Sequence, residues 1–186
     1  MEQIQRIIQG CIDGERYSQR QLYELYAPDM LVVCIRYSRT KEEAEETLHE
    51  GFLKVFRFIQ QYKYSGSLAG WIRKIMVNCA LQKHRSKTYL HAVINIDTTD
   101  IDHLGTEDIL PQLASKELLQ LIRQLPPAYR MVFNLHVFEG MKHREIASLL
   151  GISEGTSKSN LFDARTILQK AIYKNSLVAK QNINYL

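Results

Sequence analysis

Apolar residues recur along this chain at the spacing of an α-helix, and this periodicity limits the fold more than any other feature. The clearest stripes are Leu48, Phe52, Val55, Phe56 and Ile59; Ile72, Ile75, Met76 and Cys79; and Leu118, Leu119, Ile122 and Leu125. Side chains three, four and seven residues apart share one helical face, so each stripe predicts a helix that buries one side. A single strand-like run, at residues 93–96, is short and isolated. The sequence therefore predicts an all-α fold.

Loop-forming residues divide the predicted helices into two groups. Residues 97–111 are rich in acids, contain Gly105, end at Pro111 and hold few large apolar side chains. This composition is typical of a flexible linker. We therefore expect two small helical domains joined by a flexible acidic linker, with a first domain at 1–89, the linker at 90–114, a second domain at 115–175 and a C-terminal tail at 176–186.

Charged residues are segregated along the chain, although the net charge is only +4. Residues 61–90 hold six Lys or Arg and no acid, whereas residues 91–110 hold five acids and no Lys or Arg. Just upstream, residues 41–50 hold five glutamates. Such blocks indicate separate surfaces for separate partners, although solvated helix faces would give the same pattern.

The sequence lacks the motifs of catalysis, metal binding and membrane insertion. It has no phosphate-binding glycine loop, dinucleotide fingerprint or nucleophile motif, so we expect no enzyme, no catalytic residues and no cofactor. The six histidines lack metal-binding spacing, and Cys11, Cys34 and Cys79 are far apart in apolar surroundings, which predicts buried reduced thiols. No apolar run approaches the roughly 20 residues of a membrane span, and the first residues lack a signal-peptide pattern. We expect a cytoplasmic protein with no membrane contact of its own.

Residues 142–156 carry the pattern of a helix-turn-helix. Ala147 is small where two helices must cross, Gly151 permits a sharp turn, and Ser153 can accept a hydrogen bond from the next helix. That helix is expected from about Glu154 to Tyr173, and its inward stripe is Leu161, Ala164, Leu168 and Ala171 or Ile172. Its outward side chains include Lys158, Ser159, Phe162, Arg165 and Thr166. Such a helix can lie in the DNA major groove, although an ordinary pair of packed helices shares part of the pattern.

A second polar face follows the basic block of residues 61–90. It consists of Lys74, Asn78, Gln82 and Arg85, which fall at i, i+4, i+8 and i+11 opposite the apolar stripe. Cations and amides on one face can hold phosphates and hydrogen-bond bases. The preceding Ser65-Gly66-Ser67 loop, flanked by Tyr62 and Tyr64, is suited to receive an unstacked base, whereas Trp71 is expected in the core.

Three segments in order resemble the extracytoplasmic-function sigma factors of bacterial RNA polymerase, within the sigma-70 family. Glu43-Ala44-Glu45-Glu46 and Glu50-Gly51-Phe52-Leu53-Lys54-Val55-Phe56 resemble the region that docks on the polymerase. Gly66-Ser67-Leu68-Ala69-Gly70-Trp71-Ile72-Arg73-Lys74-Ile75-Met76-Val77-Asn78 resembles the stretch that opens and reads the promoter −10 element. Leu125-Pro126-Pro127-Ala128-Tyr129-Arg130-Met131-Val132-Phe133, Glu139-Gly140-Met141, Glu145-Ile146-Ala147 and Gly155-Thr156-Ser157-Lys158-Ser159 resemble the −35 binding domain. The resemblance covers about residues 19–87 and 116–173.

The resemblance implies a factor that binds core RNA polymerase and directs promoter-specific transcription initiation without bond chemistry of its own. The implied fold is a helical bundle, region 2, followed by a helix-turn-helix domain, region 4. The implied partners are core RNA polymerase (the clamp helices of the largest subunit and the flap of the second subunit), promoter DNA and, as a candidate, an anti-sigma factor. The implied polymerase-binding residues are Glu46, Glu50, Phe52 and Lys54. The implied DNA-binding residues are Lys63, Ser65, Ser67, Arg73, Lys74, Asn78, Gln82 and Arg85 for the −10 element, and Arg144, Thr156, Lys158, Ser159, Phe162 and Arg165 for the −35 element.

An alternative is a stand-alone helix-turn-helix regulator with an N-terminal sensor domain. The acid-free basic block at 61–90 disfavours it, because a ligand-sensing domain needs no second basic surface.

A few positions depart from the family pattern. Asn160 and Asp163 stand where family recognition helices often carry arginine. An acid is unfavourable beside phosphate, so we expect Asp163 to face a neighbouring basic residue or a base amine. Lys142 replaces a common capping hydroxyl, and Gly51 costs its helix about 1 kcal/mol relative to alanine.

Overall fold

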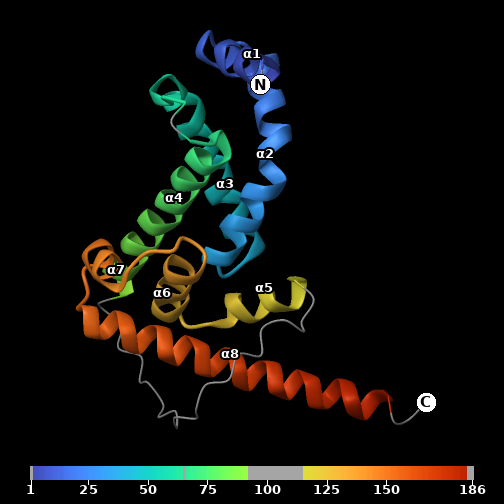
Figure 1. The fold of residues 1–186 in the computed structure, drawn as a ribbon, viewed down its shortest axis with the longest axis vertical. Coiled ribbons are helices and arrows are strands. Elements are labelled where there is room, and N and C mark those ends of the chain that lie inside the picture. Colours follow the sequence, from blue (N-terminus) through green and yellow to red (C-terminus); the bar gives the residue numbers. More distant parts are fainter. Residues whose placement is uncertain (1, 65, 92–114, 184–186) are drawn as a thin grey trace. The chain divides into compact units, whose positions relative to one another are not determined.

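The computed structural model describes residues 2–64, 66–91 and 115–183, and every regular element within these ranges is helical (Figure 1). The elements are α1 (Glu2–Ile12), α2 (Arg16–Tyr37), α3 (Lys41–Phe58), the 3-10 turn η1 (Ile59–Gln61), α4 (Leu68–His91), α5 (Ser115–Gln124), α6 (Pro127–Val137), α7 (His143–Leu150) and α8 (Glu154–Ile183). The chain divides into two compact units, Met1–Val93 and Ile94–Leu186. The predicted all-α fold is confirmed, while the strand-like run at 93–96 and residues 92–114 of the predicted linker lie outside the described residues.

The first unit is a bundle in which α2, α3 and α4 pack against one another, with α1 against α2 (Figure 1). The predicted stripes supply its core. On α3 and η1, Leu48, Phe52, Val55 and Ile59 are buried and Phe56 is half-buried; on α4, Ile72, Met76 and Cys79 are buried and Ile75 is half-buried. Each large apolar side chain removed from water stabilises the fold by about 1.5–3 kcal/mol, so these stripes fix how α3 lies against α4.

At Gly51, α3 packs closely against a core side chain of α4. The Sδ and Cε atoms of Met76 occupy the space that a side chain at residue 51 would need. Met76 is fully buried there. The helix propensity lost by glycine, about 1 kcal/mol, is therefore offset by the packing of a whole methionine side chain.

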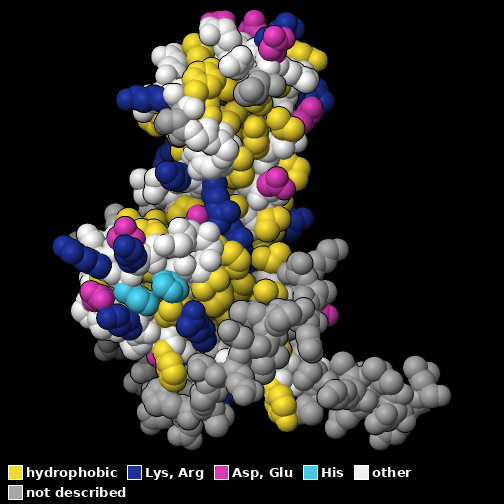
Figure 2. All heavy atoms as spheres, viewed as in Figure 1, with side chains coloured by type: hydrophobic (Ala, Val, Ile, Leu, Met, Phe, Trp, Pro, Cys, Tyr) yellow, Lys and Arg dark blue, Asp and Glu magenta, His cyan; other side chains and the backbone are white. Residues whose placement is uncertain are grey.

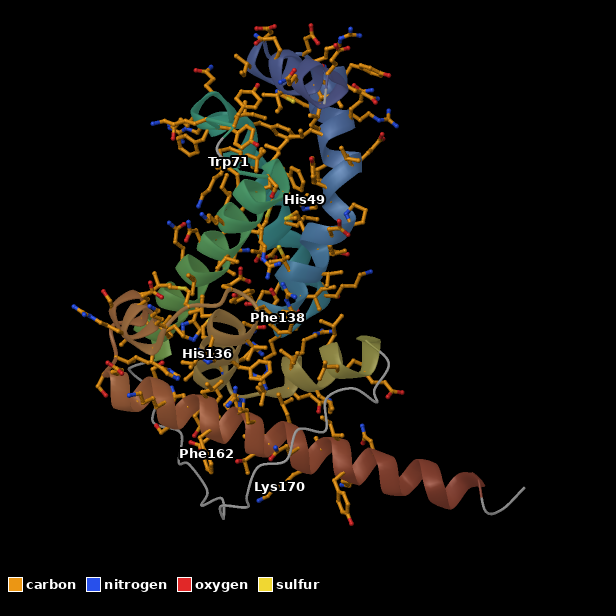
Figure 3. The ribbon with its side chains drawn as sticks, viewed as in Figure 1. His49, Trp71, His136, Phe138, Phe162 and Lys170 are labelled. Carbon is orange, nitrogen blue, oxygen red and sulfur yellow. The ribbon has the colours of Figure 1, made fainter. Side chains whose placement is uncertain are left out.

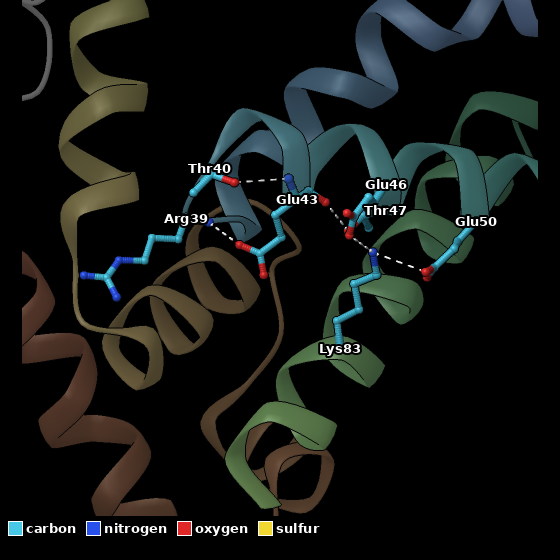
Figure 4. A network of polar contacts seen from close by, with 7 residues as sticks. All are labelled: Arg39, Thr40, Glu43, Glu46, Thr47, Glu50 and Lys83. Atoms are coloured by element: carbon cyan, nitrogen blue, oxygen red, sulfur yellow. Dashed lines mark hydrogen bonds and ion pairs between the residues drawn. The ribbon is translucent and has the colours of Figure 1, made fainter. Parts of the chain in front are cut away.

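The start of α3 is capped by side chains on both sides of its first turn (Figure 4). The Thr40 hydroxyl accepts a hydrogen bond from the backbone N–H of Glu43 at 3.2 Å, and the Glu43 carboxylate accepts one from the backbone N–H of Arg39 at 2.7 Å. The Thr47 hydroxyl donates to the carbonyl oxygen of Glu43 at 2.8 Å. The first two contacts satisfy backbone N–H groups at the start of the helix, and the third ties Thr47 to the preceding turn.

The second unit packs α8 against α6, α7 and α5. The predicted inward stripe of α8 is buried at Leu161, Ala164, Leu168 and Ile172, and Ala171 is half-buried. Helix α8 continues past the expected end near Tyr173 to Ile183. The segment from Lys174 to Ile183 contains neither glycine nor proline, so nothing in its sequence stops the helix. Residues 176–183 of the predicted tail are therefore helical.

The three cysteines are buried and free, as predicted. Burial raises the pKa of the Cys11 thiol to about 11 and that of Cys34 to about 12, so both stay protonated at neutral pH. Within the described ranges, no group of three His, Cys, Asp or Glu side chains is arranged to hold a metal ion. None of the described helices combines the length and apolar character that a membrane crossing requires.

Candidate nucleic-acid interface

The turn between α7 and α8 has the geometry that the sequence predicts for a helix-turn-helix. Gly151 adopts a left-handed backbone conformation with φ of 70°, which a residue with a side chain rarely adopts. The backbone N–H of Ile152 then donates to the carbonyl oxygen of Ala147 at 3.1 Å. At the start of α8, the Ser153 hydroxyl accepts a hydrogen bond from the backbone N–H of Thr156 at 2.9 Å. This turn fixes the direction in which α8 leaves α7.

Helix α7 begins without a capping hydroxyl, yet its first turn is closed by another side chain. The Glu145 carboxylate accepts a hydrogen bond from the backbone N–H of Lys142 at 2.7 Å. The ammonium of Lys142 has no acceptor, so it cannot cap the N–H groups itself. A capping box normally has two side-chain contacts, and only the one made by Glu145 is possible here.

The residues predicted to contact the −35 element are all exposed in the second unit. They are Arg144 on α7 and Thr156, Lys158, Ser159, Phe162 and Arg165 on α8. Phe162 points away from α6 and α7 (Figure 3). Lys158 is paired with Glu154, with 2.8 Å between Nζ and Oε1, and the Ser159 hydroxyl donates to the carbonyl oxygen of Thr156 at 3.1 Å. The outward face of α8 thus combines a base-sized aromatic ring with cations and hydroxyls, the groups that bind phosphates and base edges.

Two expectations for α8 need correction. Thr166 was predicted to face outward, but it is buried and its hydroxyl donates to the carbonyl oxygen of Phe162 at 3.0 Å. Asp163 was expected to face a basic residue or a base amine, but its half-buried carboxylate accepts a hydrogen bond from the Tyr129 hydroxyl on α6. Burial and that carboxylate raise the pKa of Tyr129. Asp163 therefore serves the packing of α8 against α6, which keeps its charge away from the outward face.

A histidine pair joins α6 to α7 beside α8. The rings of His136 and His143 are stacked, with centroids 4.7 Å apart and an interplanar angle of 13°. His136 donates from Nδ1 to the carbonyl oxygen of Met141 at 2.9 Å, and His143 Nδ1 lies 3.0 Å from the hydroxyl of Ser157 on α8. Burial, the neighbouring His136 and the ammonium of Lys158 lower the pKa of His143. Figure 2 shows histidine side chains among Lys and Arg side chains on the face in view.

The predicted −10 residues that the structure describes lie on α4 and on the turn before it. Lys74, Asn78 and Gln82 are exposed on α4, Arg73 is half-buried, and Lys63 and Ser67 are exposed before the helix. Ser67 has a structural role as well, because its hydroxyl accepts a hydrogen bond from the backbone N–H of Gly70 at 3.1 Å. Arg85 belongs to α4, but its side chain, like the whole of Ser65, lies outside the described residues.

Three aromatic rings gather at the turn between η1 and α4. The Tyr62 ring lies 4.9 Å from that of Tyr64 and 5.7 Å from that of Trp71, centroid to centroid. The Tyr62 hydroxyl donates to the carbonyl oxygen of Gly66 at 2.7 Å. Tyr64 has a φ of 57°, in the left-handed region, and is 55% exposed. Trp71 is half-buried rather than in the core as expected. The turn therefore presents aromatic surface, held in a backbone conformation that costs tyrosine about 1 kcal/mol or more.

On α3, the predicted polymerase-binding residues fall into two kinds of environment. Glu46 and Glu50 are exposed and Lys54 is half-buried at its surface. Phe52, in contrast, is only 2% exposed and packs with its ring 4.6 Å from that of Tyr23, so it supports the bundle and offers no surface to a partner. The apolar side chain that α3 presents is Leu53, which is 70% exposed. The spacing already contained this signal, because Phe52 belongs to the inward stripe and Leu53 lies seven residues after Glu46.

Polar contacts of Lys83 and of Lys54 connect α3 to α4. The Lys83 ammonium lies 3.3 Å from Oε2 of Glu46 and 3.2 Å from Oε1 of Glu50 (Figure 4). The Lys54 ammonium donates to Oε1 of Gln82 at 2.7 Å. The partners are 28 or more residues apart in the chain, and no local spacing rule predicts such pairs.

Comparison with protein families matches both units. Residues 22–89 match the family model described as Sigma-70 region 2, and residues 115–168 match Sigma-70, region 4. Together the two matches cover more than half of the chain, and they occur in the order in which the two units follow each other.

Relatives of known name agree with these matches. The chain is 23% identical to the RNA polymerase sigma-H factor of Pseudomonas aeruginosa over 92% of its own length and 94% of that protein. It is 24% identical to the ECF RNA polymerase sigma factor SigW of Bacillus subtilis, over 91% of its length and 96% of that protein. It shares its fold with the sigma factor RpoE of Bartonella quintana, solved with the anti-sigma factor NepR (TM-score 0.50, 19% identity, 83% and 96% coverage). The chain thus belongs to the sigma-70 family as a sigma factor of the extracytoplasmic-function type, a promoter-directing factor of RNA polymerase and not an enzyme.

Proposed function

We propose that the two units divide promoter recognition between them. The first, at residues 1–89, docks on core RNA polymerase through α3 and reads the −10 element through α4. The second, at residues 115–175, reads the −35 element through α8. The observation that carries this division is that α3, α4 and α8 each present an exposed polar face, while their opposite faces are buried in their own unit.

The docking surface on α3 comprises Glu46, Glu50, Leu53 and Lys54. It combines one exposed leucine with charged side chains, the composition of a polar interface around an apolar contact. The expected target is the pair of clamp helices in the largest polymerase subunit. Charges at such a contact favour rapid and specific association over raw affinity.

The −10 surface comprises Lys74, Asn78 and Gln82 on α4, with Lys63, Ser67, Arg73 and the ring of Tyr64 at the turn before it. Ser65 and Arg85 remain predictions for the same surface. Lysines and arginines hold phosphates, the two amides read bases, and an exposed aromatic ring stacks on an unpaired base. The turn and the polar face belong to one unit, so one strand of DNA can follow both.

The −35 surface comprises Arg144, Thr156, Lys158, Ser159, Phe162 and Arg165. The N-terminal residues of a recognition helix lie nearest the base edges. Thr156 and Ser159 are therefore the expected base contacts, and Lys158 and Arg165 the expected phosphate contacts. The same unit is expected to contact the flap of the second polymerase subunit. An anti-sigma factor is a further expected partner, and the cytoplasm is the expected compartment.

The proposal is tested by mixing the full chain with core RNA polymerase and a promoter duplex. We expect co-elution with core polymerase on a sizing column and promoter-specific transcripts from the mixture. Without polymerase, we expect weak DNA binding that depends steeply on salt, because the net charge is only +4. Tight sequence-specific binding by the chain alone, with no association with polymerase, would favour the stand-alone regulator instead.

A further inference from the structure

Lys54 and Gln82 belong to two different surfaces of the proposed function, yet they contact each other. The Lys54 ammonium on α3 lies 2.7 Å from Oε1 of Gln82 on α4. It also forms a hydrogen bond with the thiol of Cys79, one turn before Gln82. Cys79 is buried. The Lys54 ammonium is therefore held by two groups on successive turns of α4.

The chemistry of the ammonium decides which end of the Gln82 amide faces it. An ammonium has three donors and no acceptor, so the atom beside it must be the amide oxygen. Lys54 therefore holds the amide oxygen toward α3. The amino group of the same amide remains directed elsewhere, and Gln82 is exposed on the face that carries Lys74 and Asn78. Gln82 consequently offers a hydrogen-bond donor to a ligand on that face.

We infer that Lys54 is a positioning residue that fixes Gln82 as a hydrogen-bond donor and thereby sets the base preference of the −10 surface. The inference rests on the proposed function, in which this face of α4 contacts DNA. The amino group of Gln82, when it is the end of the amide that faces a base, suits acceptors such as guanine O6 and N7 or thymine O4. While Lys54 holds the oxygen toward α3, the amide is not free to turn both of its ends toward adenine, as the two-bond contact of a free glutamine requires. Lys54 thus selects among bases without touching one.

The ion pairs of Lys83 with Glu46 and Glu50 join α3 and α4 in the same register as the contact between Lys54 and Gln82. Lys83 is only 19% exposed on its side chain and lies between Glu46 and Glu50, which are one helical turn apart on α3. A cation bridging two carboxylates of α3 limits sliding of α3 along α4. Lys54 lies one turn beyond Glu50, so its reach to Gln82 is set by the same register.

The experiment compares base preference in transcription by core RNA polymerase supplied with the full chain. Promoters carry each of the four bases at each −10 position, and the readout is the ratio of transcripts from two promoters in one reaction. A ratio is independent of how much holoenzyme forms, so a docking defect of the variants does not alter it. The variants are Lys54→Met, Lys54→Arg, Gln82→Ala and the double variant Lys54→Met/Gln82→Ala. Lys41→Met is the matched control, because Lys41 lies on α3 and pairs with Glu45 of its own helix at 3.4 Å.

We expect Gln82→Ala and Lys54→Met to change the preference at the same single −10 position, by about five- to tenfold. Lys54→Met should raise the relative use of adenine there, because the freed amide presents both a donor and an acceptor. Lys54→Arg and Lys41→Met should keep the native preference, and the double variant should match Gln82→Ala. If Gln82→Ala changes the preference and Lys54→Met does not, the inference is wrong and the proposed −10 surface stands. If Gln82→Ala changes no preference, both the inference and the proposed role of Gln82 fail.

Discussion

On α4, the exposed amide of Gln82 is bound by Lys54 of another helix, and Lys83 in the next position is bound by two glutamates of that helix. On α8, Lys158 is paired with Glu154 one turn away, and the Ser159 hydroxyl is bound to the backbone of Thr156. Gln82 and Lys83 of α4 are thus positioned across a helix pair, whereas Lys158 and Ser159 of α8 are positioned by their own helix. A change on α3 should therefore reach the −10 surface, whereas a change on α8 should stay within the −35 surface.

The largest expected effect on the difference between α4 and α8 comes from charge reversal on α3. Glu46→Lys with Glu50→Lys should weaken association with core polymerase by about tenfold to a hundredfold, because it reverses the charge of the docking surface. It also places two lysines against Lys83, which removes two exposed ion pairs worth about 0–1 kcal/mol each. Association is measured by titrating labelled core polymerase.

The matched control for this reversal adds Lys83→Glu. The triple variant restores opposite charges between α3 and α4 but leaves the docking surface reversed. Its thermal stability should return toward the native value while its polymerase binding stays weak. Recovery of polymerase binding in the triple variant would mean that the acids act through Lys83 alone and do not touch the polymerase.

The packing between α3 and α4 predicts a second difference between the two units, in how their stability responds to a larger side chain at a glycine. Gly51→Leu should destabilise the first unit by about 1–3 kcal/mol, because the space beside residue 51 is filled by Met76. The control is Gly155→Leu in the second unit, where an added Cβ meets only the Ser153 hydroxyl, at an ordinary contact distance of 3.6 Å. Chemical denaturation is followed through Trp71 fluorescence for the first unit and through circular dichroism for both units. Equal destabilisation by both variants would contradict the close approach at Gly51.

On α8, the local ion pair predicts effects on DNA binding of a few-fold. Glu154→Gln should strengthen holoenzyme binding to all −35 variants alike, because it frees Lys158 for phosphate and removes a negative charge from the helix start. Lys158→Ala should weaken binding to all of them and lower the salt slope by about one unit. Binding to promoter duplexes at several salt concentrations measures both. A change in base preference instead of overall affinity would assign Lys158 to base reading.

The smallest effect concerns pH and is confined to the second unit. The pKa of His143 is lowered in the folded chain by burial, by the stacked His136 and by Lys158 and Arg165, against an opposing effect of Glu154. As the pH falls below about 6.5, His143 is protonated in the unfolded chain before it is protonated in the folded chain. The free energy of unfolding of the second unit therefore decreases in this range. Circular dichroism melting at about pH 7.5 and about pH 5.5 should show a Tm lower by a few degrees at acid pH. His143→Gln should reduce that difference, and an unchanged difference would assign the pH response to other groups.

The sequence predicted most of the fold and only part of the interfaces. Helical stripes such as Ile72, Met76 and Cys79 and the turn at Gly151 are local patterns, so they were readable without coordinates. The pairing of Glu154 with Lys158 was readable too, since it follows the i, i+4 rule. The contact between Lys54 and Gln82 was not, because it depends on how α3 lies against α4.

Burial also corrected roles that residue type alone suggested. Phe52 is an aromatic residue in the segment predicted to dock on the polymerase, but its ring lies in the core of the bundle, and the exposed apolar side chain is that of Leu53. Asp163 is an acid on the helix that we propose to read the −35 element, but its carboxylate accepts a hydrogen bond from Tyr129 of α6. Both residues lie at helix–helix contacts, and the packing of the helices determines whether such a side chain is buried or exposed.

The central claim, that α4 reads the −10 element and α8 reads the −35 element, is tested most directly by one promoter matrix. Core RNA polymerase with the native chain, Asn78→Ala or Ser159→Ala transcribes promoters mutated singly at every position of both elements. We predict that Asn78→Ala changes preference at one or two −10 positions, by about 1–3 kcal/mol each if its contact is bidentate. Ser159→Ala should change preference only among −35 variants. A shift of Asn78→Ala confined to −35 variants, or of Ser159→Ala confined to −10 variants, would contradict the assignment of the two units.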